Sequence, residues 1–139
     1  MPQLPRVARA DLLTVVAAVV EQAGRILICQ RKRGQAHELK WEFPGGKVEA
    51  GESPEAALCR ELREELAIEA VVDREITRYQ YAYPNRPPIL LIFFRVTEFH
   101  GDPRNLVFER MEWESWERLR DYDFLEGDVE FISQSKNAS

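Results

Sequence analysis

The stretch from Gly46 to Ile68 constrains the fold more than any other part of the chain, because it predicts one well-capped helix. Ser53 is a favoured N-cap residue and Pro54 suits the first helical position, so we expect a helix from Ser53 or Pro54 to about Leu66. Successive helical residues advance by roughly 100°, which gathers the apolar side chains on one stripe. That stripe consists of Leu58, Cys59, Leu62 and Leu66. The helix must therefore bury one side against other elements of the chain.

The same helix carries three glutamates within little more than one turn, Glu61, Glu64 and Glu65. Like charges three or four residues apart repel each other and destabilise a helix by roughly 0.2–0.5 kcal/mol per pair. Glu61 and Glu65 lie at the margin of the apolar stripe, where partial burial makes an unpaired charge costly. A hard divalent cation with oxygen ligands would offset that cost, whereas a solvated face would place the charges opposite the stripe. From the spacing alone, a metal site and a charged surface helix are equally good interpretations.

An apolar strand end and a glycine turn precede the helix, in the run Trp41-Glu42-Phe43-Pro44-Gly45-Gly46-Lys47. Paired glycines allow unusual backbone angles and the close approach of a ligand to main-chain groups. A carbonyl of this turn could complete the oxygen shell of a cation, and Lys47 could meet a phosphate. The pair of glycines by itself favours an ordinary tight turn. A turn, a glutamate, a capped helix and an acidic turn in this order are better explained by a functional site.

These residues resemble the Nudix box, the signature of the Nudix hydrolase superfamily. At the spacings of that signature the chain has Gly46, Glu52, Arg60, Glu61, Leu62, Glu64, Glu65, Ala67 and Ile68. The one departure is Ala67, where the family has a glycine that ends the helix, so we expect a slightly different helix exit and intact metal ligands. The resemblance extends more loosely over nearly the whole chain, nearest to the MutT-type and CTP-type nucleoside triphosphate pyrophosphohydrolases. It implies a single Nudix hydrolase domain over residues 1–139, folded as an α/β/α sandwich around a mixed β-sheet.

The resemblance also implies Mg²⁺-dependent hydrolysis of a phosphoric anhydride, with Mn²⁺ as a substitute cation. Metal ions that bridge carboxylates and phosphates neutralise the phosphate oxygens and acidify the attacking water. The predicted metal ligands are Glu61, Glu64, Glu65 and, from the family pattern, the carbonyl of Gly46. The predicted catalytic residues are Arg60, Glu61 and Glu64, with Arg60 orienting a glutamate through a bidentate contact. The general base stays open between a box glutamate and two later residues, Glu109 and Glu112, each of which could be an ordinary surface residue.

Contacts to the nucleotide are expected outside the box, because in MutT-type enzymes the base lies against the early loop, the strand hairpin and the last helix. The substrate-binding residues that we predict are Lys32, His37, Phe43, Lys47, Tyr83, Arg86 and Asp128. An aromatic face can stack on a base, and a carboxyl group can read the base edge. Structural alternatives remain: Phe43 and Tyr83 as core residues, His37 as a lone loop histidine, and Asp128 as a first-turn helix residue.

Three functions fit these residues. The favoured one is hydrolysis of nucleoside triphosphates to a nucleoside monophosphate and pyrophosphate, with oxidised nucleotides such as 8-oxo-dGTP or CTP-like nucleotides as candidates for nucleotide pool sanitation. The second keeps the chemistry but acts on a dinucleotide, a nucleotide sugar or capped RNA. The third is a non-catalytic module that senses a nucleotide, which the intact Arg60 and box glutamates argue against. The preferred base and sugar stay open.

The chain before the glycine turn predicts two strands and a loop. Segments 13–20 and 25–31 should form a hairpin that turns at Ala23-Gly24, and a polar loop should follow over 32–40. The apolar run Leu12–Val20 resembles a signal peptide only faintly, because no small-residue cleavage site follows it, and it is too short to span a membrane. Its repeated valines favour a buried strand instead.

The chain after the box helix predicts further strands and a final helix. Segments 70–83 and 89–99 are rich in β-branched and aromatic residues and should pair across the turn Pro84–Pro88. The remaining predicted elements are a short strand near 111–113, a helical turn over 115–120 and a helix from about 125 to 134. No internal repeat or low-complexity linker interrupts this order, which suits helices packed on both faces of a mixed sheet.

The composition of the chain limits the classes of partner that it is expected to bind. With a net charge of −5 over 139 residues, the chain is not expected to bind nucleic-acid polymers, since these require basic patches. Cys29 and Cys59 lack metal-type spacing and lie among apolar residues, so we predict reduced core cysteines. We therefore expect a cytoplasmic monomer or homodimer that binds a small-molecule nucleotide and no membrane.

Overall fold

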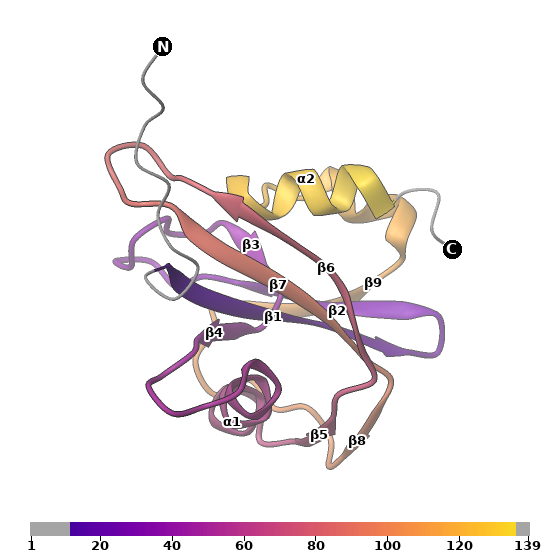
Figure 1. The fold of residues 1–139 in the computed structure, drawn as a ribbon. Helices are drawn as coiled ribbons and strands as arrows, with labels where there is room; N and C mark the ends of the chain where they lie inside the picture. The colour runs from indigo at the N-terminus through magenta and orange to yellow at the C-terminus, as the bar shows by residue number, and fades with distance from the viewer. Residues whose placement is uncertain (1–11, 136–139) are drawn as a thin grey trace.

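The computed structural model describes residues 12–135, and Figure 1 shows them as a mixed sheet with one main helix on each side. The strands are β1 (Leu13–Gln22), β2 (Arg25–Gln30), β3 (Trp41–Glu42), β4 (Gly45–Lys47), β5 (Glu69–Val71), β6 (Arg74–Tyr81), β7 (Ile89–Val96), β8 (Glu98–His100) and β9 (Arg110–Glu114). The helices are α1 (Pro54–Leu66), the short 3₁₀ helix η2 (Trp116–Asp121) and α2 (Glu126–Ser135). None of the helices in this range is long and apolar enough to cross a membrane. The first and last residues of the predicted domain 1–139 lie outside the described range.

Strand β1 lies at the centre of the main sheet, which has the strand order β3-β2-β1-β7-β6. Its residues from Val16 to Val20 are buried, as a continuous apolar run in a central strand requires. β1 pairs in parallel with β7 and antiparallel with β2, so the predicted mixed sheet is confirmed. The predicted hairpin is confirmed as well, with Gln22 opposite Arg25. In addition, β4 pairs with β1 and β9 pairs with β2.

Two predicted strand segments pair as expected but are each divided in two. β6 and β7 run antiparallel with a register shift between Glu75 and Thr77, while β5 and β8 form a separate two-stranded sheet. Ala70 on β5 and Phe99 on β8 pack against the core that lies under α1. After α1 and again after β7, the chain therefore lies outside the main sheet and covers part of the core under α1. The predicted glycine turn also differs, because Gly45–Lys47 extends into a strand on β1.

Each face of the main sheet has its own hydrophobic core. The core on one face contains Leu58, Leu62 and Leu66 of α1 together with alternate residues of β1 and β7. The core on the other face contains Phe124 and Phe131 from the C-terminal segment and Phe93 of β7. Figure 1 shows α1 and α2 on opposite sides of the sheet. The predicted α/β/α sandwich is confirmed.

Helix α1 has the predicted bounds and cap. The Ser53 hydroxyl accepts a 3.1 Å hydrogen bond from the Ala56 N–H, and Pro54 opens the helix. We expected Ala67 to change the helix exit, and that prediction is wrong. Ala67 adopts the left-handed conformation that glycine usually supplies at this place, with φ 59° and ψ 36°, and its N–H donates to the Arg63 carbonyl at 3.1 Å. The alanine therefore keeps the geometry of a glycine cap.

The two cysteines differ in burial. Cys29 is fully buried on β2, and burial is the main reason that its pKa is raised well above the ordinary value. Cys59 is only half-buried, so the prediction that it is a core residue is wrong. It lies at the edge of the apolar stripe, where its thiol donates to the Ala70 carbonyl at 3.4 Å. Both thiols are free.

Candidate active site

The segment between β3 and α1 brings two glycines against neighbours that leave no room for a side chain. A Cβ atom on Gly45 would collide with the carbonyl oxygen of Val16 on β1. A Cβ atom on Gly46 would lie 2.5 Å from Cδ of Glu61. Gly46 also pairs with Val16 in the antiparallel ladder between β4 and β1. Gly46 thus allows the Glu61 carboxylate to pack directly on the main chain of β4, and Gly45 allows β4 to approach the main chain of β1.

Glu61 and Glu65 lie one helical turn apart on α1 and share a crowded environment. Glu65 accepts a 3.2 Å hydrogen bond from the Gly45 N–H. Burial, followed by the charges of Glu61 and Glu42, raises the pKa of Glu65 to about 9. Burial also raises the pKa of Glu61, although its contact with Arg60 lowers it. The two carboxyl groups lie within hydrogen-bonding distance of each other, so they carry a concentration of negative charge that favours a shared proton or a cation.

Arg60 organises the acidic residues around the glycines. Its Nε and Nη2 donate to the two carboxylate oxygens of Glu52 at 2.7 and 3.0 Å, which is the predicted bidentate contact. Its Nη1 donates to Glu61 at 2.9 Å and to Glu64 at 3.2 Å. Nη2 also donates to the Lys47 carbonyl at 3.0 Å and so joins α1 to β4. The hydrogen bonds from Arg60 are the main cause that lowers the pKa of Glu52 to about 2.

The predicted metal ligands are close together but do not form a complete set. Within residues 12–135, no group of three or more His, Cys, Asp or Glu side chains is arranged to hold a metal ion. Glu61 and Glu65 approach each other beside Gly46, whereas the Glu64 side chain is 56% exposed and bound by Arg60. The donor set still fits a hard cation, because crowded carboxylates with raised pKa values gain from a positive charge placed between them.

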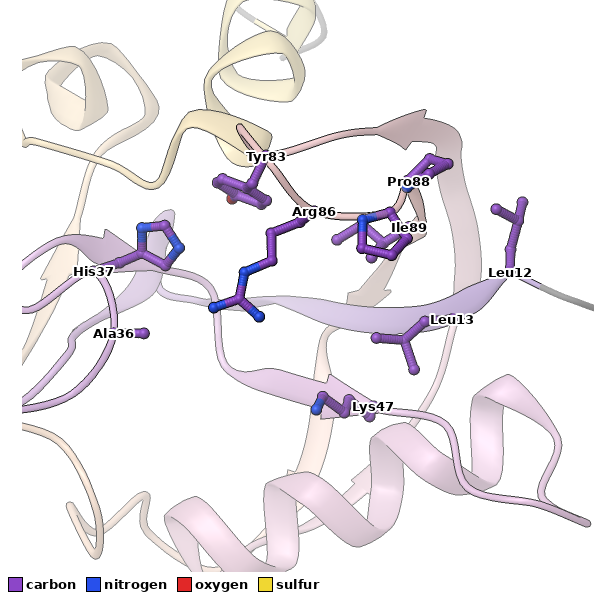
Figure 2. A pocket seen from close by; sticks show the side chains of 10 residues that line it. Leu12, Leu13, Ala36, His37, Lys47, Tyr83, Arg86, Pro88 and Ile89 are labelled. Atoms are coloured by element: carbon purple, nitrogen blue, oxygen red, sulfur yellow. The ribbon is translucent and has the colours of Figure 1, made fainter. Parts of the chain in front are cut away.

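A cleft runs from these glycines to the turn between β6 and β7. It consists of two cavities, of about 250 Å³ and 490 Å³, whose shared walls are His37, Lys47, Tyr83 and Ile89. The smaller cavity reaches Gly46, Glu65 and Asp128. The larger cavity, drawn in Figure 2, extends past Arg86 to Leu13 and Pro88. Of the predicted substrate-binding residues, the structure brings His37, Phe43, Lys47, Tyr83, Arg86 and Asp128 to the walls of this one cleft.

Asp128 and Phe43 form a buried part of the smaller cavity. Asp128 is only 6% exposed, and burial, followed by the charge of Glu42, raises its pKa well above the ordinary value. A hydrogen bond from the Phe43 main chain acts in the opposite direction. The Phe43 ring packs against Phe93, Phe124 and Phe131 at centroid distances of 6.2, 5.4 and 5.6 Å. Phe43 is therefore a core residue that also lines the cavity.

Tyr83 connects three parts of the cleft. Its hydroxyl accepts a 3.0 Å hydrogen bond from the Gly127 N–H at the start of α2. The His37 ring lies 4.9 Å from the Tyr83 ring with an interplanar angle of 45°, and Tyr81 packs edge-on at 4.8 Å. Figure 2 shows the His37 and Tyr83 rings facing the same space. Tyr83 thus links the early loop, the β6–β7 turn and α2.

Two charged residues of the cleft, Arg31 and Glu42, were not among the predicted site residues. Nη1 of Arg31 donates to both carboxylate oxygens of Glu42, at 3.3 and 3.2 Å. Burial nevertheless raises the pKa of Glu42 to about 7. The sequence does contain a signal for this residue, because Glu42 stands between the buried residues Trp41 and Phe43. An ionisable group inside a buried strand is a candidate for a functional site.

Six predicted residues line neither cavity: Arg60, Glu61 and Glu64 of α1, and Lys32, Glu109 and Glu112. Lys32 lies in the exposed loop, where its N–H donates to the Gln35 side chain at 2.9 Å. Glu109 is exposed, and Glu112 accepts a 2.9 Å hydrogen bond from Arg110 on the same strand. The structure therefore leaves the box glutamates as the carboxylates nearest to the glycines, and the identity of the base stays a prediction.

The fold and this arrangement match one protein family over almost the whole chain. Residues 11–134 match the family model of the NUDIX domain. This chain belongs to the Nudix family of hydrolases. The predicted family and its enzyme class are thereby confirmed.

The chain is also similar to individual members of that family over most of its length. It is 38% identical over 121 residues to the CTP pyrophosphohydrolase of Escherichia coli, covering 87% of this chain and 89% of that protein. It is 32% identical over 125 residues to the 8-oxo-dGTP diphosphatase of the same organism, covering 89% of this chain and 96% of that protein. Among solved structures, the solution structure of the E. coli ORF135 protein has a TM-score of 0.81 at 36% identity, with 91% and 92% of the two chains covered. The crystal structure of a MutT NUDIX hydrolase from Burkholderia pseudomallei has a TM-score of 0.79 at 26% identity, with 88% and 96% covered.

Proposed function

We propose that this protein hydrolyses nucleoside triphosphates to a nucleoside monophosphate and pyrophosphate, with Mg²⁺ as the divalent cation. The observation that carries the proposal is the crowded pair Glu61 and Glu65 beside Gly46, at the edge of a cleft large enough for a nucleotide. The relatives support this substrate class, since one is a CTP pyrophosphohydrolase and another an 8-oxo-dGTP diphosphatase. Cytosine-type and oxidised triphosphates are therefore the first substrates to test.

In this proposal the residues of the chain supply positioning and proton transfer. A bound cation would neutralise phosphate oxygens and acidify the attacking water. Glu61, Glu64 and Glu65 would hold it together with the Gly46 carbonyl, and Arg60 would keep Glu61 in place through its 2.9 Å hydrogen bond. A box glutamate would accept the proton of the water. Attack on the β-phosphorus breaks its bond to the oxygen that bridges the α- and β-phosphates, and that oxygen leaves with the nucleoside monophosphate.

The test is a hydrolysis screen over nucleoside triphosphates, a dinucleotide and a nucleotide sugar, in which both products are identified. We expect monophosphate and pyrophosphate from a triphosphate with Mg²⁺, and no hydrolysis with a chelator. Glu61→Gln and Glu65→Gln should each lower kcat at least about 100-fold while the protein stays folded, because the amide removes the ligand charge. Glu55→Gln is the matched control, since Glu55 is an exposed glutamate of the same helix. Chelator-insensitive hydrolysis, or wild-type rates in both site variants, would refute the proposal.

Asp128 is proposed to read the base edge. A carboxylate accepts hydrogen bonds from an amino group or a ring N–H, and a protonated carboxyl group can also donate one. Asp128→Ala should change the ratio of kcat/KM between competing nucleotides by roughly tenfold, about 1.4 kcal/mol, with unchanged metal dependence. An equal loss of activity with every nucleotide would mean that Asp128 only supports the start of α2.

A further inference from the structure

Three tyrosines alternate at the end of β6 and directly after it: Tyr79, Tyr81 and Tyr83. Alternate residues of an extended chain point to the same side, so one face of the sheet carries all three rings. Each hydroxyl forms a hydrogen bond with the start of α2, which lies beside the end of β6 in Figure 1. Tyr83 lines the cleft, whereas Tyr79 and Tyr81 line neither of its cavities. Tyr79 therefore holds α2 from outside the cleft.

The Tyr79 hydroxyl contacts two main-chain groups of α2. It donates to the Gly127 carbonyl at 2.5 Å and accepts a 3.2 Å hydrogen bond from the Phe131 N–H. Gly127 and Phe131 are four residues apart, which is the spacing of the two partners in an ordinary helical hydrogen bond. The helix can satisfy these two groups by itself, so it does not need the hydroxyl in order to form. What the hydroxyl adds is a connection between α2 and β6.

That connection is made at the peptide group next to Asp128. The Gly127 carbonyl belongs to the peptide group that joins Gly127 to Asp128, and a peptide group is planar. The N–H of the same peptide group, which is that of Asp128, donates to the Leu125 carbonyl at 2.9 Å. Hydrogen bonds at both ends of this plane thus fix the direction in which the Asp128 side chain leaves the main chain. The Tyr83 hydroxyl holds the preceding peptide group through the Gly127 N–H.

The packing around Gly127 leaves the start of α2 little room to move. A Cβ atom on Gly127 would lie 2.8 Å from the Tyr83 hydroxyl oxygen and 3.1 Å from Cδ1 of Leu91 on β7. Glycine therefore allows α2 to approach the tyrosines closely. On the opposite side, the buried Asp128 carboxylate accepts a hydrogen bond from the Phe43 main chain. Asp128 is thus placed between β6 and the segment that follows β3.

We propose that Tyr79 is a positioning residue for Asp128 and that it thereby sets the preference of the enzyme among nucleobases. This inference rests on the proposed function, in which Asp128 reads the base edge, and it adds a residue that acts without touching the nucleotide. Hydrogen bonds weaken steeply when their distance or angle departs from the optimum, so a small displacement of the carboxyl group weakens its contacts to a base. The connection at the peptide group beside Asp128 limits that displacement.

The test compares kcat/KM for competing nucleoside triphosphates in the wild type and in Tyr79→Phe. Phenylalanine keeps the ring contact with Phe93, at a centroid distance of 5.6 Å, and lets the Gly127 carbonyl and the Phe131 N–H bond each other directly, so the variant should fold. The ratio of kcat/KM between the preferred nucleotide and its competitor should fall at least about threefold, mainly through KM. The kcat for the preferred nucleotide should change less than about twofold, with unchanged metal dependence.

The matched control is Tyr81→Phe. It removes the same group two residues away, where the hydroxyl donates to the exposed Glu126 side chain at 3.1 Å and not to the main chain of α2. We expect the wild-type ratio of kcat/KM in this variant. Thermal unfolding checks that each variant is folded.

Two further variants separate positioning from general support of the fold. In an Asp128→Ala background, Tyr79→Phe should change the ratio less than about twofold, because its effect passes through Asp128. Gly127→Ala should lower the ratio in the same direction as Tyr79→Phe, because its methyl group displaces the start of α2 while every tyrosine is kept. A wild-type ratio in Gly127→Ala would contradict the inference independently of Tyr79→Phe.

The other outcomes are equally decisive. An unchanged ratio in Tyr79→Phe, or an equal loss with every nucleotide, would mean that Tyr79 only supports the fold. A further change in the double variant would mean that Tyr79 acts independently of Asp128, and the inference is then wrong. If Asp128→Ala alone leaves the ratio unchanged, the role of Asp128 and this inference both fall, but hydrolysis to monophosphate and pyrophosphate stands. A wild-type protein that hydrolyses no triphosphate removes the proposed function as well.

Discussion

Ala67 holds a left-handed conformation at the end of α1 that its methyl group disfavours. Ala67→Gly should therefore raise the free energy of unfolding by about 1 kcal/mol, because glycine adopts this conformation at little steric cost. Chemical denaturation measures the change, and hydrolysis should keep its wild-type rate. Ala56→Gly, at an exposed position within the same helix, should lower the free energy of unfolding instead. Destabilisation by Ala67→Gly would show that the alanine is not strained.

Glu42 should make stability depend on pH. Burial raises its pKa from about 4.5 to about 7, so the folded protein keeps a proton that the unfolded chain has lost. The contribution of this proton to the free energy of unfolding is fully present below about pH 4.5 and is lost as the pH rises through about 7. Between about pH 5 and pH 8, the unfolding free energy of the wild type should therefore fall relative to that of Glu42→Gln, by on the order of 1–3 kcal/mol.

Urea unfolding of both proteins at several pH values measures this difference. Glu42→Gln also removes the carboxylate that pairs with Arg31, but an arginine does not titrate between about pH 5 and pH 8, so that loss adds a constant offset to the unfolding free energy and does not change its slope with pH. Parallel pH profiles for the two proteins would contradict the assignment of the pKa to Glu42.

Local spacing fixed the predicted positions of the box residues, whereas the family resemblance pointed to the cleft residues, such as His37, Tyr83 and Asp128. Arg60 and the box glutamates share one helix, so their relative positions follow from the helical repeat. Arg31 illustrates the limit, because it lines the cleft where its neighbour Lys32 was expected. Neighbouring residues of an extended chain point to opposite sides, so a shift of one residue exchanges the cavity wall for solvent. Only the pairing of β2 with β3 settles which residue faces inward.

At the scale of elements, the segment after β8 holds the C-terminal end of α1. The Arg104 N–H donates to the Leu66 carbonyl at 2.8 Å, and the Leu106 N–H donates to the Glu65 carbonyl at 3.1 Å. These carbonyls lie in the last turn of the helix, where intrahelical donors are lacking. Asn105 fixes the segment, since its side chain accepts from the Phe108 N–H at 2.7 Å and donates to the Phe108 carbonyl at 2.9 Å.

Asn105→Ala should loosen this connection and with it the position of Glu65. We expect a loss of about 1–3 kcal/mol in unfolding free energy and faster hydrogen exchange of the Leu106 amide, because the clamp on Phe108 is removed. Asn105→Asp should lose less, since it keeps the acceptor for the Phe108 N–H. Unchanged exchange at Leu106 in Asn105→Ala would show that the segment is held by other contacts.

Elements with a strong repeat or a clear cap were predicted well, and the short strand β9 and the helical turn η2 also lie where they were predicted, whereas β4, β5 and β8 were not predicted as separate strands. The β1–β2 hairpin, α1 and α2 have their predicted places, because apolar periodicity and turn residues mark them locally. The division into β5 and β6 was not predicted, since it results from packing against α1. The strand β4 was predicted as a turn, because only contact with β1 makes it extended.

At the scale of the whole molecule, the two apolar cores predict that the chain folds without a metal. Both faces of the sheet are covered by apolar side chains. Mg²⁺ should nevertheless raise Tm, because a ligand that binds only the folded state stabilises it, by about 2.7 kcal/mol at 100 times its Kd.

Glu65→Gln is the informative variant for this effect. Its Tm without metal should exceed that of the wild type, because the pKa of about 9 means that the folded state disfavours the charge that Glu65 carries when unfolded at neutral pH. Its response to Mg²⁺ should be smaller, since a ligand charge is lost. Thermal unfolding with and without Mg²⁺ measures both effects, with Glu55→Gln as the control. Equal Mg²⁺ shifts in wild type and Glu65→Gln would remove Glu65 from the metal site.

The central place of β1 has a consequence for synthesis on the ribosome. β1 leaves the ribosome before the other described elements, but its parallel partner β7 is complete only at Val96. Until then, one edge of an apolar strand lacks its native hydrogen bonds and is free to pair with other chains. The growing chain must therefore keep an aggregation-prone edge apart from its neighbours from the emergence of β1 until the emergence of β7 ends that exposure.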